Sequence, residues 1–252
     1  MNNLLALFGS IVVLAAPITQ GAACGAPPAS FETPRKRIAL TFDADMTSDM
    51  QRQLTDGHVN SWYNHELIDY LDREQVKATL FLTGMWTETY PGEAKTLAQD
   101  PLFEIANHSY SHPAFAQPCF GLHGANDADK KYELYHSQHV IQEITGAEPK
   151  FFRFPGGCHN QTDLDLVRGM GLEPIQWDVV SGDSFSTNTA GIVHNIVTRA
   201  FDGAVVVAHM NNGPNAPKTA DAMKEAVPML RDMGYQFVTL SELITETSTT
   251  CK

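Results

Sequence analysis

The chain has 252 residues and a mass of 27.7 kDa, which suits one domain with a large core or two small domains. Hydrophobic residues make up 43% of it and charged residues 18%, a composition that excludes a disordered or low-complexity chain. The formal net charge of −12 repels phosphate backbones and anionic lipid surfaces, so we expect no nucleic-acid partner.

The first 23 residues carry no ionised side chain and are typical of a secretory signal peptide. An apolar run from Leu4 to Pro17 is followed by small residues at positions 21–23. The run is too short to span a bilayer comfortably, so we expect a secreted or cell-envelope protein without stable membrane insertion. Lipid attachment to Cys24 is the alternative interpretation.

Four cysteines are present, and no two of them form a CxxC pair. In a secreted chain this pattern favours disulfides over a thiolate metal site. Among the three pairings that four cysteines allow, we expect Cys24 with Cys251 and Cys119 with Cys158. Free buried thiols are the alternative if the chain is not secreted.

From Arg37 onward, short apolar runs alternate with longer segments of helical period. The predicted strands are Arg37–Phe42, Ala78–Leu82, Phe103–Ala106, Phe151–Phe154, Pro174–Val179, Ala204–Ala208 and Gln236–Val238. The predicted helices are Tyr63–Asp72, Ala94–Gln99, Lys131–Ile144, Asp163–Met170, Ala190–Phe201 and Ala220–Met233. This alternation predicts one α/β domain over residues 34–245, followed by a tail at residues 246–252.

The predicted strands have the composition of a parallel sheet. The strand Ala204–Ala208, for example, is apolar at successive positions, as in strands that are buried on both faces. Seven such strands form either a barrel or an open doubly wound sheet. In both architectures the functional residues lie at the carboxyl ends of the strands, so we expect the site at those positions.

The first strand ends in two carboxylates, Asp43 and Asp45. Because they are two residues apart, an extended chain directs both to the same side. Paired acids at a strand end can divide the tasks of binding and proton transfer. The structural alternative is that either residue makes an Asx turn or caps the next helix.

The third strand ends in two histidines, His108 and His112, just before Pro113. Histidines at positions i and i+4 share one face if the segment makes a helical turn, and this spacing suits a divalent metal. A lone histidine is more often an ordinary core or surface residue. The pair directly beyond a buried strand therefore predicts a metal site.

The later strands also end in polar groups. Arg153 closes the fourth strand, Asp178 and Asp183 follow the fifth, and His209 follows the sixth. Each residue alone has an ordinary explanation as a turn, capping or surface residue. Their repetition at successive strand ends favours one shared site.

Taken in order, the segments TFDAD, HSYSHP, RFPGG, WDVVSGD and VAH resemble the five motifs of the polysaccharide deacetylase family, carbohydrate esterase family 4. They extend from Thr41 to His209, across nearly all of the chain after the signal peptide. The resemblance implies a distorted, incomplete (β/α) barrel with about seven parallel strands. It also implies hydrolysis of acetyl groups on sugar polymers.

The resemblance also implies roles for individual residues. Asp43 matches the catalytic base, Arg153 the arginine that orients it, and His209 the general acid. His108 and His112 match two metal ligands. Val207 stands where a leucine usually lines the pocket for the acetyl methyl group.

The sequence departs from the family pattern at two places. The third metal ligand usually follows the base directly, but that position is Ala44, so we expect Asp45 to complete the metal site, with Asp43 as the alternative ligand. In the fourth motif, Val180 and Ser184 replace an aspartate that supports the catalytic histidine and a tryptophan that walls the pocket. Either Asp178 or Asp183 remains to support His209.

These residues predict a metal-dependent hydrolase that removes N-acetyl groups from a polysaccharide, most plausibly an acetylglucosamine polymer such as chitin or peptidoglycan. Two imidazoles and one carboxylate favour zinc, with cobalt and nickel as alternatives. An inactive carbohydrate-binding protein on the same scaffold, an esterase acting on O-acetyl xylan or exopolysaccharide, and an amidase of peptides or small molecules are the other hypotheses.

Three loops that extend from the strand ends are expected to shape the substrate groove, at residues 46–60, 114–130 and 210–218. Trp62, Trp86 and Phe185 are candidates for stacking on sugar rings, and ordinary packing is the alternative for each.

Overall fold

The computed structural model describes residues 35–247, which belong to one compact unit that begins at Pro34. In this range a single sheet contains eight strands, and all of its strand pairs are parallel. The strands are β1 (Lys36–Ala44), β2 (Ala78–Leu82), β3 (Phe103–Asn107), β4 (Phe151–Phe152), β5 (Glu173–Pro174), β6 (Val179–Val180), β7 (Ala204–His209) and β8 (Tyr235–Phe237).

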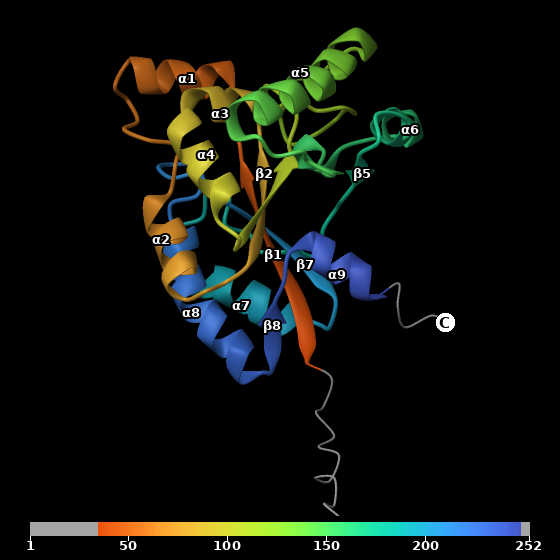
Figure 1. Ribbon diagram of the computed structural model, residues 1–252. Coiled ribbons are helices and arrows are strands. Elements are labelled where there is room, and N and C mark those ends of the chain that lie inside the picture. Colours follow the sequence, from red (N-terminus) through yellow and green to blue (C-terminus); the bar gives the residue numbers. More distant parts are fainter. Residues whose placement is uncertain (1–34, 248–252) are drawn as a thin grey trace, which may run out of the picture. The chain divides into compact units, whose positions relative to one another are not determined.

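The strands follow the order β5-β4-β3-β2-β1-β7-β6, and β8 pairs with the first residues of β1. The sheet curls into a half-barrel (Figure 1). The curl is evident from one contact, because Arg153 beyond β4 donates to Asp43 on β1 at 2.7 Å. In a flat sheet these strands would lie about 14 Å apart, at roughly 4.8 Å per strand.

Helices alternate with the strands and surround the sheet (Figure 1). They are α1 (Ser48–Thr55), α2 (His65–Arg73), α3 (Gly84–Thr89), α4 (Pro91–Gln99), α5 (Asp127–Thr145), α6 (Gln161–Gly169), α7 (Thr189–Arg199), α8 (Thr219–Asp232) and α9 (Leu240–Thr247), with a 3₁₀ turn at Pro155–Gly157. In the part of the chain that the structure describes, no helix combines the length and apolar character needed to cross a membrane.

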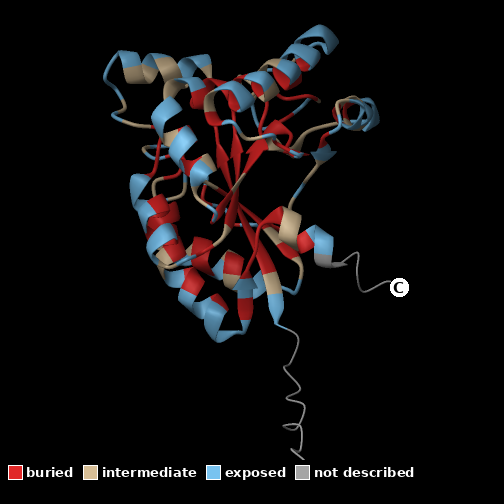
Figure 2. Cartoon of the chain, in the orientation of Figure 1, coloured by how far each residue is buried: buried red, intermediate tan, exposed pale blue. Residues whose placement is uncertain are grey.

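The two faces of the sheet bury different groups, and Figure 2 shows the strands as the most buried part of the unit. Ile38, Leu40 and Phe42 of β1 belong to the large core between the sheet and its helices. Ala39, on the alternate face, packs in a smaller cluster that includes Leu240 and Leu243. Since strand residues alternate between faces, Asp43 lies on the same concave face as Ala39, beyond the part filled by α9.

Most predicted strands and helices are present with bounds shifted by a few residues, whereas three helices, α1, α3 and α9, were not predicted. The predicted strand Pro174–Val179 is wrong, because it divides into β5 and β6 at opposite edges of the sheet. Ile175 N donates to Phe152 O at one edge, and Asp178 N donates to Val205 O at the other. The chain between them crosses the gap in the barrel, so it cannot form one ladder.

The expected disulfide between Cys119 and Cys158 is present. It joins the loop after β3 to the turn after β4. The predicted signal peptide, Cys24 and its proposed bond to Cys251 lie outside the described residues.

Candidate active site

The two central strands, β1 and β7, place an acid and a histidine side by side. Asp43 and His209 are direct partners in the register of these parallel strands, at the carboxyl end of each. In Figure 1, β1 runs from the lower edge toward α1 and α3, so the site lies at the end of the sheet near those helices. The side chains of Asp43 and His209 are 5% and 17% exposed, which places the pair at the floor of an accessible site.

Asp43 is held by an arginine that is completely buried. Arg153 Nη1 donates to Asp43 Oδ1 at 2.7 Å. The guanidinium carbon also lies 3.9 Å from the centre of the Phe81 ring, so packing fixes its plane. A buried charge pair of this kind orients the carboxylate, because moving the carboxylate away would leave the buried arginine charge without a partner.

The two histidines converge through a turn that is not helical. Ser109 and His112 have φ values of 68° and 64°, in the left-handed region, so the segment does not make the helical turn that would place histidines at i and i+4 on one face. Asn107 Oδ1 accepts from Ser109 N, and Glu133 of α5 accepts from the backbone amides of Tyr110 and Ser111. These side chains satisfy the amides that a helix would have paired internally.

His108 has a fixed ring orientation. Its Nδ1 lies 2.9 Å from the carbonyl oxygen of Arg153, and because a carbonyl only accepts, Nδ1 carries the proton. The other ring nitrogen, Nε2, faces Asp43 and Asp45. A backbone acceptor behind the ring is the usual arrangement for a histidine that binds a metal.

Asp45, His108 and His112 have the geometry of a metal site. Their ligand atoms all lie within 4.8 Å of one another. Asp45 Oδ1 is 3.5 Å from His108 Nε2 and 3.3 Å from His112 Nε2. Ligands bound tetrahedrally to zinc at their normal distances are separated by about 3.4 Å. Asp45 Oδ1 is also buried without a hydrogen-bond partner, so these residues fit a divalent metal.

Two asparagines beyond β7 hold Asp45, and the sequence did not identify them. Asn211 accepts from the backbone amide of Asp45 and donates to its carbonyl, each at 2.9 Å. Asn215 Nδ2 donates to Asp45 Oδ2 at 3.3 Å. Ala44 between the acids is fully buried in the core, so Asp43 and Asp45 share the concave side of the sheet. In the sequence, the only sign of this arrangement is that Asn211 and Asn215 follow the VAH segment closely.

Asp183, and not Asp178, contacts His209. Asp183 Oδ1 accepts from His209 Nδ1 at 2.9 Å, and Oδ2 accepts from the backbone amide of His209 at 2.8 Å. Ser181 and Thr219 also donate to this carboxylate, and neither was predicted. Asp178 instead accepts from Val205 N, four residues before His209 and about 13 Å away along an extended strand.

The charges of the site shift the pKa values of its groups. Burial raises the pKa of Asp45, but His112, His108 and His209 outweigh burial and hold that pKa well below its ordinary value. Burial lowers the pKa of His209, but Asp183, Asp45 and Asp43 outweigh it and raise the pKa to about 10. His209 is therefore protonated at neutral pH, the state that a proton donor requires.

The remaining predicted residues have different surroundings. Val207 is buried beside the site, and Val180, its partner in β6, is 46% exposed. Ser184 Oγ lies 3.3 Å from His209 Nδ1. Trp62 and Trp86 are buried in the core, which leaves packing as their role.

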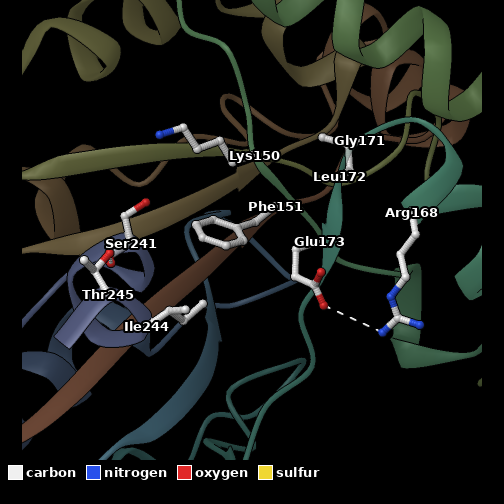
Figure 3. Close-up of a pocket in the computed structure, with 9 residues that line it drawn as sticks. All are labelled: Lys150, Phe151, Arg168, Gly171, Leu172, Glu173, Ser241, Ile244 and Thr245. Atoms are coloured by element: carbon white, nitrogen blue, oxygen red, sulfur yellow. Dashed lines mark hydrogen bonds and ion pairs between the residues drawn. The ribbon is translucent and has the colours of Figure 1, made fainter. Parts of the chain in front are cut away.

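A pocket of about 580 Å³ lies elsewhere, between the amino ends of β4 and β5 and helix α9 (Figure 3). Arg168 and Glu173 form an ion pair at its rim, 3.7 Å apart. None of the predicted site residues lines it. The candidate site is therefore defined by the strand ends and not by this pocket.

Comparison with known proteins identifies relatives of this site and fold. The family described as polysaccharide deacetylase matches residues 31–175. A peptidoglycan-N-acetylglucosamine deacetylase of Bacillus cereus is 28% identical over 209 residues, which cover 83% of this chain and 68% of that protein. The peptidoglycan-N-acetylmuramic acid deacetylase PdaC of Bacillus subtilis is 30% identical over 83% of this chain, which spans only 39% of that longer protein.

Solved structures give the same relationship. The Bc1960 peptidoglycan N-acetylglucosamine deacetylase superposes with a TM-score of 0.70 at 26% identity, covering 83% of this chain and 88% of that one. A family 4 acetyl xylan esterase from Clostridium thermocellum, solved with a cobalt ion, has a TM-score of 0.67 at 26% identity, covering 84% and 92%. Because the family model matches more than half of the chain and the relatives cover most of it, the chain belongs to the polysaccharide deacetylase family, a family of hydrolases.

Proposed function

We propose that this protein is a secreted or envelope-associated, metal-dependent deacetylase that removes N-acetyl groups from an acetylglucosamine polymer. In this proposal residues 34–245 are the catalytic domain behind a signal peptide at residues 1–23. One observation carries it: Asp45, His108 and His112 direct three ligand atoms to one point, between a buried carboxylate and a protonated histidine. Peptidoglycan is the leading polymer because relatives in Bacillus and Listeria are named for deacetylating it.

The metal-binding residues would be Asp45, His108 and His112, with zinc favoured by this donor set and cobalt or nickel as alternatives. A bound divalent ion would polarise the acetyl carbonyl and lower the pKa of the attacking water. The orphaned Asp45 Oδ1 supports this assignment independently of the family, because a buried carboxylate oxygen without a donor is costly unless a cation occupies the site.

The other residues move protons. Asp43, oriented by Arg153, accepts the proton of the water whose oxygen adds to the carbonyl carbon. His209 donates a proton to the amide nitrogen as the carbon–nitrogen bond breaks, so the products are acetate and a free amino group. Asp183 occupies Nδ1 of His209, and Nε2, which is 3.9 Å from Asp45 Oδ2, faces the site and carries the donated proton.

Acetate release tests the proposal directly. The wild-type protein with zinc should release acetate from peptidoglycan or from N-acetylglucosamine oligomers. Asp43→Asn should lower kcat by about a hundredfold or more while zinc affinity, measured by calorimetry, stays unchanged. If Asp43→Asn also loses zinc, Asp43 is a ligand. Acetate from acetylated xylan alone would establish an esterase, and glycan binding without any acetate would establish a binding protein.

A further inference from the structure

Two phenylalanines are the most exposed large apolar side chains among the described residues. Phe120 is 90% exposed and Phe185 is 76% exposed. Both also have left-handed backbone conformations, with φ values of 43° and 55°. A bulky residue adopts this conformation only where its surroundings impose it, and such strain gathers at functional sites.

The positions of the strained residues support this interpretation. Five residues other than glycine have positive φ in the described range. Ser109 and His112 form the turn that carries the histidine ligands, and Phe120 and Phe185 lie in loops that follow the carboxyl ends of β3 and β6. Only Gln75 lies at the opposite end of the sheet, in the connection that leads into β2. The strain is thus concentrated around the proposed catalytic centre.

The loop of Phe185 contacts His209 on one side and the asparagine that supports Asp45 on the other. It comes two residues after Asp183, and the intervening Ser184 contacts His209. Its backbone amide donates to the carbonyl of Asn215 at 2.6 Å, and the side chain of Asn215 donates to Asp45. These contacts hold the backbone of Phe185 in place, so its exposed side chain starts from a defined position in the loop beside the proposed proton donor.

Phe120 lies on the other side of the centre. The disulfide of its neighbour Cys119 with Cys158 fixes the loop to the turn after β4. A methyl group added at Gly156 would lie 3.3 Å from Phe120 Cδ2, so the ring is beside the segment that follows Arg153. Since β3, which precedes the loop of Phe120, and β6, which precedes Phe185, lie on opposite sides of β1 in the strand order, Asp43 and Asp45 lie between the elements that carry the two rings.

We propose that Phe120 and Phe185 are stacking platforms for sugar rings on either side of the deacetylation centre. This inference rests on the proposed function, because a polymer threaded through the centre extends past it in both directions. The apolar C–H face of a pyranose covers the aromatic ring and removes apolar surface from water, which stabilises the bound sugar. A phenyl ring offers no hydrogen bond, so it suits the repeated apolar faces of a polymer.

A protein partner fits these rings less well. Stable protein interfaces bury about 800 Å² on each partner around a contiguous apolar centre. Here two single rings are separated by charged and polar groups of the site, Asp43, Asp45 and His209. The arrangement matches a narrow extended ligand that touches both rings and the residues between them.

The test compares Phe120→Ala and Phe185→Ala with Phe201→Ala. Phe201 is a matched control, because it is 50% exposed but precedes β7 at the amino end of the sheet. The substrates are N-acetylglucosamine oligomers of two and six sugars and the glycan strands of peptidoglycan. On the longer substrates we expect each site variant to raise KM about tenfold with kcat nearly unchanged. On the two-sugar oligomer the change should stay within about twofold, and Phe201→Ala should match the wild type throughout.

Further variants and a binding measurement separate this inference from other causes. Phe185→Tyr should retain wild-type KM, whereas damage to the centre would lower zinc affinity and kcat. Calorimetric binding of the six-sugar oligomer and of the glycan strands tests the platforms even if no acetate is released, an outcome that would reject only the proposed function. Equal KM and equal binding in wild type and both alanine variants, or no binding by the wild type, would overturn the platforms.

Discussion

The two halves of the candidate site differ in how far the protein alone satisfies their polar atoms. Around Asp45, the imidazole nitrogens of His108 and His112 lie at 3.5 and 3.3 Å, and Oδ1 has no hydrogen-bond partner. Around Asp183, four donors from His209, Ser181 and Thr219 lie between 2.6 and 2.9 Å. One oxygen of Asp45 therefore has no hydrogen-bond partner, whereas both oxygens of Asp183 are hydrogen-bonded. We call the group of Asp45, His108 and His112 the open half, and the group of Asp183 and its donors the complete half.

This difference separates two tasks. Buried polar atoms are nearly always paired, so an orphaned carboxylate oxygen between two imidazoles indicates a place for a cation. A fully bonded carboxylate instead fixes one histidine in one orientation and one tautomer. We therefore expect variants of the first half to change metal binding, and variants of the second half to change turnover alone.

The largest effect should come from removing an imidazole of the open half. His108→Ala should weaken zinc binding about a hundredfold or more and abolish acetate release, because two ligands cannot hold the ion. Chelator-treated wild type should lose activity in the same way and regain it with zinc. His139→Ala is the control, since His139 is an exposed residue of α5. Zinc affinity at the wild-type level in His108→Ala would exclude His108 as a ligand.

The complete half should respond through turnover. Asp183→Asn should lower kcat by about 10²–10³-fold, because the amide no longer fixes the tautomer and charge of His209. Asp178→Asn removes the same charge from an exposed position and should change kcat by less than about twofold. Both should bind zinc as the wild type does. Equal losses in the two variants would mean that the contact with His209 is not what matters.

A smaller effect on zinc affinity is expected when the hydrogen bond from Asn215 to Asp45 is removed. Asn215→Ala should weaken zinc binding about tenfold, because Asp45 loses the donor that positions its second oxygen. Asn212→Ala changes an exposed asparagine in the same loop and serves as the control. Calorimetric titration with zinc measures both. If the two variants bind equally well, the orientation of Asp45 does not depend on Asn215.

The smallest effect belongs to one hydroxyl of the complete half. Thr219→Val keeps the buried shape but removes a donor to Asp183, at a cost of about 1 kcal/mol, so kcat should fall about fivefold. Thr219→Ser retains the hydroxyl and should recover most of the activity. A larger loss in the serine variant than in the valine variant would show that packing of the methyl group dominates.

The sequence predicted the parts of the fold that depend on local pattern. The predicted β2 has the observed bounds, and β1 and β7 differ from theirs by one or two residues, because continuous apolar runs specify strands buried on both faces. The same pattern placed Asp43 and His209 at strand ends, and the structure adds that these two strands are neighbours in the sheet. Segments with few apolar residues were predicted less well, and α1, which buries none of its residues, was missed.

The rest depended on contacts that no local pattern contains. The left-handed turn at Ser109 and His112 is imposed by Asn107 and by Glu133 on another helix. The choice between Asp178 and Asp183 required the path of the chain across the gap in the barrel. Asn211 and Asn215 hold Asp45 from more than 160 residues away in the sequence, and amide side chains are too common in loops to be singled out.

The break between β5 and β6 also affects how the molecule behaves at high concentration. A sheet that does not close leaves two borders whose free backbone groups can recruit an extended strand from another molecule. Here both border strands are two residues long, and the chain crosses directly from one to the other. Neither border offers a ladder long enough for another chain to extend. The borders formed by β5 and β6 are therefore poor templates for aggregation, although they leave the half-barrel open beside the candidate site.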